Sequence, residues 1–292
     1  MKINEIFLGD FFKLIKEIED ESIDLIVCDG PYGVTEKKWD KPRKIYIQRG
    51  KVKNIQEFNL QLIKILSKKL KTGGSFYLFG KPDCIDFIDY KPYLTLNSKI
   101  VWYQPSRLAQ GRISYTNNYD IIAYFTKGKA KTFNLNEIRV PQLVELTHRK
   151  RCENVPSVVN GEFGKTKFNE RGKNPGDVWG DIKQLTYKSK ELLSREYLHT
   201  IQKPKKLIER IVKASSNEGD LVLDPFAGTG TTLVVCQEIK RNYIGFEINP
   251  NLFSICKKRI SEIKSEQEGM LYSTSRHVAF TEKEIIAKNL GE

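Results

Sequence analysis

The sequence predicts an α/β fold in which a mostly parallel sheet is covered by helices on both faces. Short apolar runs of strand length alternate along the chain with segments of helical periodicity, which is typical of such sheets. One helix is expected within Ile55–Lys71, with Phe58, Leu62, Ile65 and Leu66 on its apolar face, and the pair Gly73-Gly74 is expected to end it before a strand at Gly74–Gly80. A further strand is expected at Tyr119–Thr126 and an amphipathic helix at Lys205–Ser215. Two of the runs end in an aspartate, the position at which open α/β sheets bind ligands. The length of 292 residues suits one large domain with an inserted module better than two independent domains.

The first ligand-binding pattern is the sequence LVLDPFAGTGTT in the carboxyl-terminal third of the chain. A strand expected over Asp220–Leu223 ends at Asp224, and a helix is expected over Thr231–Lys240. Between them, Gly228 and Gly230 permit a tight turn and a close approach of the backbone to a ligand. The turn lacks a Gly-Lys-Ser/Thr ending, so the pattern does not indicate a phosphate-binding loop.

An acidic residue follows this turn at an informative distance. A second strand is expected over Asn242–Ile248, and it carries Glu247 nineteen residues after Gly228. A carboxylate at that spacing can accept hydrogen bonds from ribose hydroxyls. Asn249 and Pro250 then predict the start of another helix. The unit therefore predicts a site for a ligand that contains a ribose.

The second pattern is a tetrapeptide after an expected strand at Ile23–Cys28. In isolation, Gly-Pro sequences are more often simple turns than binding sites. Here each residue has a chemical role for a nucleobase: Asp29 would accept an N–H bond from an exocyclic amino group, and the carbonyl of Gly30 would accept the second. Pro31 would stiffen the turn and Tyr32 would stack on the base.

These motifs resemble the β-type S-adenosylmethionine-dependent DNA amino-methyltransferases, which modify adenine N6 or cytosine N4. The similarity covers most of residues 3–262, including an opening block with Gly9-Asp10, the segment NNYDIIAYFTKG, the segment PGDVW and the signature HTIQKP at His199–Pro204. The catalytic half precedes the cofactor half in this motif order. Two positions depart from the family pattern, since Gly30 and Thr200 stand where the family usually has proline.

The resemblance implies a Rossmann-like methyltransferase fold with a seven-stranded sheet, one strand of which is antiparallel. It divides the chain into a catalytic half at 1–128, a target-recognition insert at 129–180, a cofactor-binding half at 181–266 and a tail at 267–292. The cofactor would be S-adenosylmethionine, and no metal is expected. Catalysis is assigned to Asp29, Gly30, Pro31 and Tyr32. Cofactor contacts are assigned to Asp10, Lys203, Asp224, Phe226, Ala227, Gly228, Gly230, Thr231 and Glu247.

The reaction implied is direct transfer of a methyl group to N6 of an adenine rotated out of duplex DNA. Asp at position 29 resembles the adenine-N6 members more than the cytosine-N4 members. Cytosine N4, an RNA substrate and a catalytically silent DNA-binding subunit remain alternatives, and Gly30 is the residue that keeps the last one open. The sequence also leaves open a homodimer and a restriction endonuclease partner.

Charge agrees with a nucleic-acid partner, because the formal net charge is +13. Residues 37–53 hold eight basic residues and one acidic residue, and Thr147–Asn174 holds seven basic residues and three Glu. Most such side chains contact phosphate, and few read bases. The candidate DNA contacts are Lys37, Lys38, Trp39, Arg43, Lys44, Arg149, Lys150, Arg151, Lys165, Lys167, Arg171 and Lys173.

Other classes of protein are not supported. The five cysteines are widely spaced and contain no CxxC pair, which indicates neither a disulfide framework nor a zinc site. No apolar run has the roughly twenty residues that a membrane span needs, and Met1–Asp20 does not resemble a signal peptide. We therefore expect a cytoplasmic protein without a membrane partner.

Overall fold

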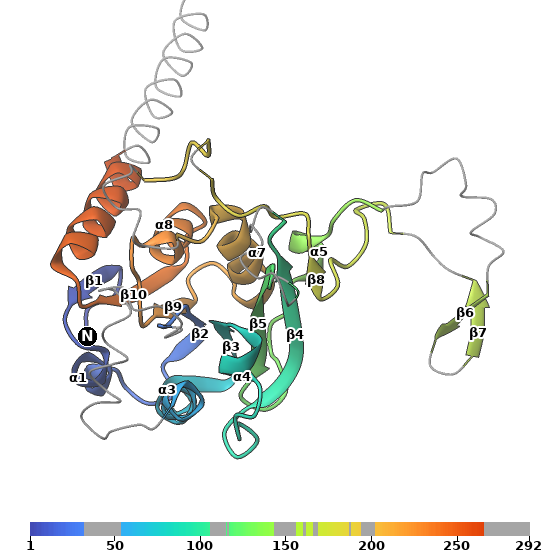
Figure 1. Cartoon of the computed structure of the whole chain (residues 1–292), viewed down its shortest axis with the longest axis horizontal. Coiled ribbons are helices and arrows are strands. Elements are labelled where there is room, and N and C mark those ends of the chain that lie inside the picture. Colours follow the sequence, from blue (N-terminus) through green and yellow to red (C-terminus); the bar gives the residue numbers. More distant parts are fainter. Residues whose placement is uncertain are drawn as a thin grey trace, which may run out of the picture.

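The computed structural model describes residues 1–31, 54–105, 115, 117–142, 156–159, 162–165, 169–186, 188–193 and 202–265. Within these ranges one sheet has the strand order β1-β10-β9-β2-β3-β5-β4-β8 (Figure 1). Its strands are β1 (Glu5–Leu8), β2 (Ile23–Cys28), β3 (Leu70–Gly80), β4 (Thr95–Tyr103), β5 (Tyr119–Thr126), β8 (Val178–Trp179), β9 (Leu221–Asp224) and β10 (Asn242–Glu247). A separate antiparallel hairpin consists of β6 (Pro156–Val159) and β7 (Glu162–Lys165).

The strand directions confirm a mostly parallel sheet with one antiparallel strand, which is β5. The predicted number of seven strands is wrong, because β8 adds an eighth at the edge. It pairs in parallel with β4, with Val101 opposite Val178 and Trp102 opposite Trp179. The indole of Trp102 also donates to the carbonyl oxygen of Ile182 at 2.8 Å. The chain that returns from the predicted insert is thus fixed to the sheet edge.

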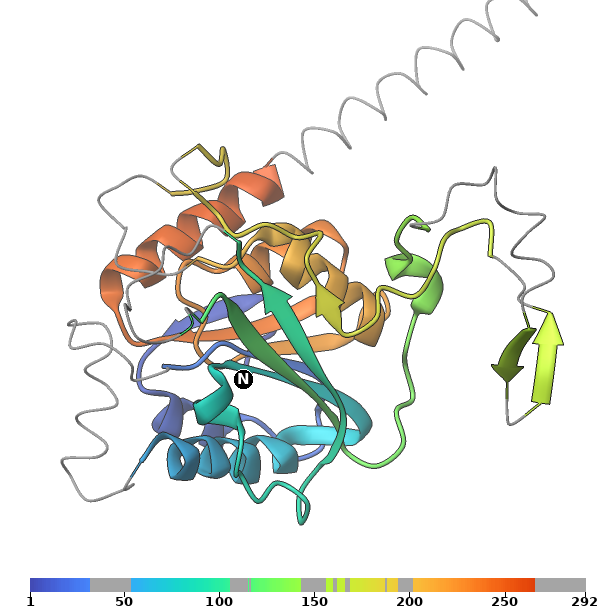
Figure 2. The same ribbon diagram turned by 45° about the vertical axis from the view of Figure 1, so that its right-hand side comes forward.

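Helices cover both faces of the sheet, as predicted (Figures 1 and 2). On one face lie α7 (Lys205–Ser215), α8 (Thr231–Glu238) and a helix at residues 250–265. On the other lie α1 (Phe11–Leu14), α3 (Ile55–Lys69) and α4 (Pro82–Ile85). The remaining short helices are η1 (Ile15–Glu17) and α5 (Leu135–Ile138). In the described ranges, no helix is long and apolar enough to cross a lipid bilayer.

The junction between α3 and β3 differs from the sequence prediction. Gly73 and Gly74 were expected to end the helix before a strand at Gly74–Gly80, but the helix ends at Lys69 and the strand runs through both glycines. Gly73 has φ +84°, and a Cβ on Gly74 would lie 2.9 Å from the carbonyl oxygen of Asp24. Gly73 therefore provides a backbone conformation that other residues rarely adopt, and Gly74 permits close packing against β2; neither glycine ends the helix.

Candidate active site

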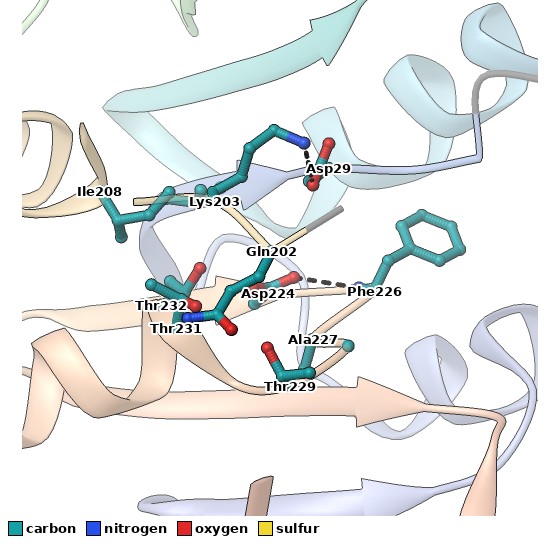
Figure 3. Close-up of a pocket in the computed structure, with 12 residues that line it drawn as sticks. Asp29, Gln202, Lys203, Ile208, Asp224, Phe226, Ala227, Thr229, Thr231 and Thr232 are labelled. Atoms are coloured by element: carbon teal, nitrogen blue, oxygen red, sulfur yellow. Dashed lines mark hydrogen bonds and ion pairs between the residues drawn. The ribbon is translucent and has the colours of Figure 1, made fainter. Parts of the chain in front are cut away.

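Two neighbouring strands bring the two sequence motifs together. β2 and β9 pair in parallel, with Leu25 opposite Val222 and Ile26 opposite Leu223. Asp29 follows β2 and Asp224 ends β9, so both carboxylates lie at the carboxyl edge of the sheet. They line one pocket (Figure 3). The other lining residues are Val27, Gln202, Lys203, Ile208, Phe226, Ala227, Gly228, Thr229, Thr231 and Thr232.

The glycine-rich turn after β9 has the tight geometry that the sequence predicted. Gly228 and Gly230 have φ angles of +54° and +82°, which side chains rarely adopt. The amide of Gly230 donates to the carbonyl of Ala227 at 2.7 Å, and Gly230 is the N-cap of α8. A Cβ on Gly230 would also overlap the sulfur of Cys256. Position 230 therefore requires glycine, and glycine at position 228 adopts its left-handed conformation without strain.

Glu247 closes the turn from the neighbouring strand β10. Its Oε2 accepts the amide N–H of Gly228 at 2.8 Å, and its Oε1 accepts that of Asn249 at 2.7 Å. Burial raises the pKa of the Glu247 carboxyl. Asp10 lies after the adjoining edge strand β1, where its side chain caps α1 by accepting the amide of Phe12 at 2.8 Å. The structure thus brings the predicted ribose acceptor to the glycine turn and gives Asp10 a helix-capping contact.

Asp224 is the most strongly perturbed carboxyl group in the pocket. Its side chain is 4% exposed, and burial raises its pKa to about 7. Hydrogen bonds from the Thr232 hydroxyl and the Phe226 amide oppose this rise, whereas the charges of Asp29 and Glu247 add to it. The amide of Phe226 lies 3.1 Å from Oδ1. A carboxyl group with this pKa changes its charge near neutral pH.

The catalytic tetrapeptide is described only through Pro31. Tyr32, the predicted stacking residue, lies outside the described residues. Gly30 lies close to the cofactor turn. A Cβ atom at this position would be in van der Waals contact with the Phe226 ring at 3.5 Å and with the Leu62 side chain at 3.7 Å. The Phe226 ring also packs on Phe11, with centroids 5.3 Å apart. The two halves of the site are therefore in direct contact.

Lys203 lies between the two motifs. Its side chain is 5% exposed, and its ammonium contacts Oδ2 of Asp29 at 2.5 Å. The sequence assigned Lys203 to the cofactor through the HTIQKP signature, and the lysine does line the pocket. Its contact with the catalytic candidate was not predicted, because nothing in the sequence relates residues 174 positions apart.

Gln202 is a pocket residue that the sequence analysis missed, although it belongs to the same signature. Its amide donates to the carbonyl of Glu191 at 2.9 Å and accepts the amide N–H of Leu193 at 3.3 Å. These bonds connect the signature to the chain segment before it. The signature HTIQKP, which contains Gln202, was the available signal for it.

Few of the predicted DNA contacts fall in the described ranges. Arg171 and Lys173 are exposed on the segment after β7, and the backbone of Lys173 pairs with that of Val140. Lys165 is placed only as a residue of β7. The other candidates lie outside the described residues: Lys37, Lys38, Trp39, Arg43, Lys44, Arg149, Lys150, Arg151 and Lys167.

Comparisons with known proteins give the same result as the motifs. Residues 23–258 match the DNA methylase family N6_N4_Mtase. The Type II methyltransferase M.HpaI of Haemophilus parainfluenzae is 33% identical over 254 residues, which cover 85% of this chain and 71% of the relative. The DNA adenine methyltransferase YhdJ of Escherichia coli K12 is 32% identical over 287 residues, 92% of this chain and 90% of the relative.

Solved structures support the fold at lower identity. The M1.HpyAVI complex with SAM has a TM-score of 0.56 at 22% identity, covering 88% of this chain and 98% of the other. The cytosine-N4-specific PvuII DNA methyltransferase has a TM-score of 0.57 at 18% identity, covering 89% and 90%. With the family match, the homologues and the paired motifs in agreement, the chain belongs to the S-adenosylmethionine-dependent DNA amino-methyltransferases of the N6/N4 family.

Proposed function

We propose that this enzyme transfers the methyl group of S-adenosylmethionine to N6 of an adenine rotated out of duplex DNA. The observation that carries the proposal is the shared pocket, in which Asp29 and the glycine turn of residues 224–231 meet at the ends of adjacent strands. A transfer enzyme needs its acceptor group and its cofactor side by side, since much of the rate gain comes from alignment.

The residues present fit the cofactor. The backbone of the turn, with Gly228 and Gly230, lets a ligand approach closely, and Glu247 offers carboxylate oxygens for ribose hydroxyls. The ionised form of Asp224 brings negative charge to the pocket, which suits the positive sulfonium of S-adenosylmethionine, whereas the charge of Asp29 is paired with Lys203. When bound, the cofactor supplies an electrophilic methyl group. Phe226, Ala227, Thr231 and Asp10 complete the proposed cofactor set.

The chain's own catalytic contribution is to hold an amino group. An exocyclic amine conjugated to a base is a poor nucleophile, and a carboxylate that accepts one of its N–H bonds increases the electron density on nitrogen. We assign this role to Asp29, and the second N–H to the carbonyl of Gly30. Pro31 stiffens the turn and Tyr32 stacks on the base. The residue 30 acceptor is a backbone group, so glycine at this position retains it.

Adenine is favoured over cytosine by two observations. Position 29 is Asp, and YhdJ, whose name describes an adenine methyltransferase, aligns with nearly the whole chain. Cytosine N4 is the second candidate, because the same pocket chemistry can hold its amino group. The PvuII enzyme is cytosine-N4-specific, but at 18% identity it supports only the fold.

Duplex DNA is the proposed substrate, and residues 129–180 are the proposed recognition insert. Arg171 and Lys173 are exposed within it, as contacts to phosphate require. M.HpaI and several other relatives are named Type II methyltransferases, which supports a place beside a restriction endonuclease. A homodimer would double the basic surface available to one duplex.

The decisive experiment incubates the protein with labelled S-adenosylmethionine and mixed-sequence duplex DNA, then digests the DNA to nucleosides. Label in N6-methyladenine is the expected result. Label in N4-methylcytosine would move the proposal to the second candidate. Transfer to RNA but not to duplex DNA would reject the DNA substrate, and binding of the cofactor without any transfer would favour a silent subunit.

A further inference from the structure

We infer that Lys203 is a positioning residue that holds the Asp29 carboxylate in the orientation needed to receive the amino group of the target base. This inference rests on the proposed function and changes the role of Lys203 from cofactor contact to support of the catalytic carboxylate. The contact itself belongs to the free protein, so it can be tested without turnover.

The geometry of Lys203 is that of a fixed charge. Its ammonium lies 2.5 Å from Oδ2 of Asp29 and 5.4 Å from the ring centroid of Phe79. The lysine side chain is 5% exposed, whereas that of Asp29 is 26% exposed. The more accessible member of the pair is thus the carboxylate, which must meet the base, and the buried member is the lysine that holds it. Figure 3 shows the contact between the two side chains.

The backbone on either side of Lys203 is fixed as well. The side-chain amide of Gln202 donates to the carbonyl oxygen of Glu191 at 2.9 Å and accepts the backbone N–H of Leu193 at 3.3 Å. Pro204 is the N-cap of α7, and its carbonyl oxygen accepts the amide N–H of Leu207 at 3.0 Å. A long flexible side chain loses much entropy when it is held in one conformation. Anchoring on both sides reduces the number of conformations from which Lys203 must reach Asp29.

This support matters because Asp29 follows β2 at the carboxyl edge of the sheet and its side chain is partly exposed. The contact with the Lys203 ammonium restrains rotation of the Asp29 carboxylate, so its removal should widen the range of directions in which the acceptor oxygen points. A misplacement of about 1 Å in an aligned site costs on the order of 100-fold in rate. Lys203→Met should therefore reduce turnover rather than cofactor affinity.

The first arm of the test measures thermal unfolding of four proteins without substrate: wild type, Lys203→Met, Asp29→Asn and the double variant. If the lysine acts through Asp29, Lys203→Met lowers the melting temperature of the wild type but not that of the Asp29→Asn protein. An equal decrease in both backgrounds would overturn the inference. This arm remains decisive even if the wild type transfers no methyl group, which would reject the proposed function separately.

The second arm measures kcat, the KM for a long unmethylated duplex and the Kd for S-adenosylmethionine. For Lys203→Met we expect kcat to fall about 100-fold, while KM and Kd change less than about threefold, and Lys203→Arg should recover part of kcat. Lys205→Met is the matched control, because Lys205 is two residues away and pairs with Glu238 outside the pocket. A tenfold loss of cofactor affinity with normal kcat would overturn the inference.

Discussion

Asp224 gives the sharpest test of the electrostatics of the pocket. Burial raises its pKa from 3.8 to about 7, so the folded protein binds a proton at this site more tightly than the unfolded chain does. A carboxyl group with a raised pKa contributes stability that is fully present below its unfolded pKa and is lost as pH rises through the folded pKa. At 1.36 kcal/mol per pKa unit, the loss amounts to about 4 kcal/mol.

The perturbation is Asp224→Asn, which cannot ionise and retains an oxygen for the Phe226 amide. The free energy of unfolding in urea is measured for wild type and variant from pH 5 to pH 8. Over this rise in pH the wild type should lose about 3 kcal/mol of stability that the variant keeps, because most of the titration of Asp224 falls in this range. Asp220→Asn is the control, since Asp220 accepts its hydrogen bond at the surface. Parallel stability curves for wild type and Asp224→Asn would refute the reasoning.

Three further predictions follow from the same site. Asp29→Ala should abolish methyl transfer but retain cofactor binding by calorimetry, and full activity would remove Asp29 from the base pocket. Neutralising residues 149–151 should reduce the slope of the logarithm of the DNA-binding constant against the logarithm of the salt concentration by about 0.9 for each side chain that contacts a phosphate. An unchanged slope would exclude these residues from the DNA interface. Gly30→Ala should raise the free energy of unfolding in urea by about 0.4–1 kcal/mol. Gly230→Ala should lower it by about 1–3 kcal/mol, because Gly230 has a φ of +82° and a Cβ there would overlap Cys256. The opposite order of stability would contradict the two turns.

The sequence predicted the elements that carry a strong local pattern. β5 and α7 have the expected bounds, and the apolar face of α3 is buried at Phe58, Leu62 and Leu66. The glycine turn was predictable for a similar reason, because its backbone conformation excludes most side chains at two positions. In these cases the local sequence and the tertiary packing favour the same structure.

Features that depend on pairing between distant segments were not predictable. β8 has only two residues, and it is a strand because Val178 and Trp179 return to the edge of β4. Likewise, the sequence contains both Asp29 and Lys203 but not the distance between them. The fold sets that distance, because Asp29 follows β2 and Lys203 lies two residues before α7, which packs on one face of the sheet.

The charges at this edge also predict how the pocket distinguishes the cofactor from its product. S-adenosylmethionine carries a positive sulfonium, whereas S-adenosylhomocysteine has a neutral sulfur and the same amino acid group. With a pKa of about 7, Asp224 is ionised in about one tenth of molecules at pH 6 and in about nine tenths at pH 8.

If the ionised form favours the cation, the affinity ratio of cofactor to product should rise by up to about ninefold between these pH values. Calorimetry with both ligands at each pH measures the ratio, and effects of their shared groups cancel in it. In the Asp224→Asn protein the ratio should not change with pH. A ratio that is constant in the wild type would show that Asp224 does not sense the sulfonium, and the negative charge that favours the cofactor would then have to come from Asp29 or Glu247.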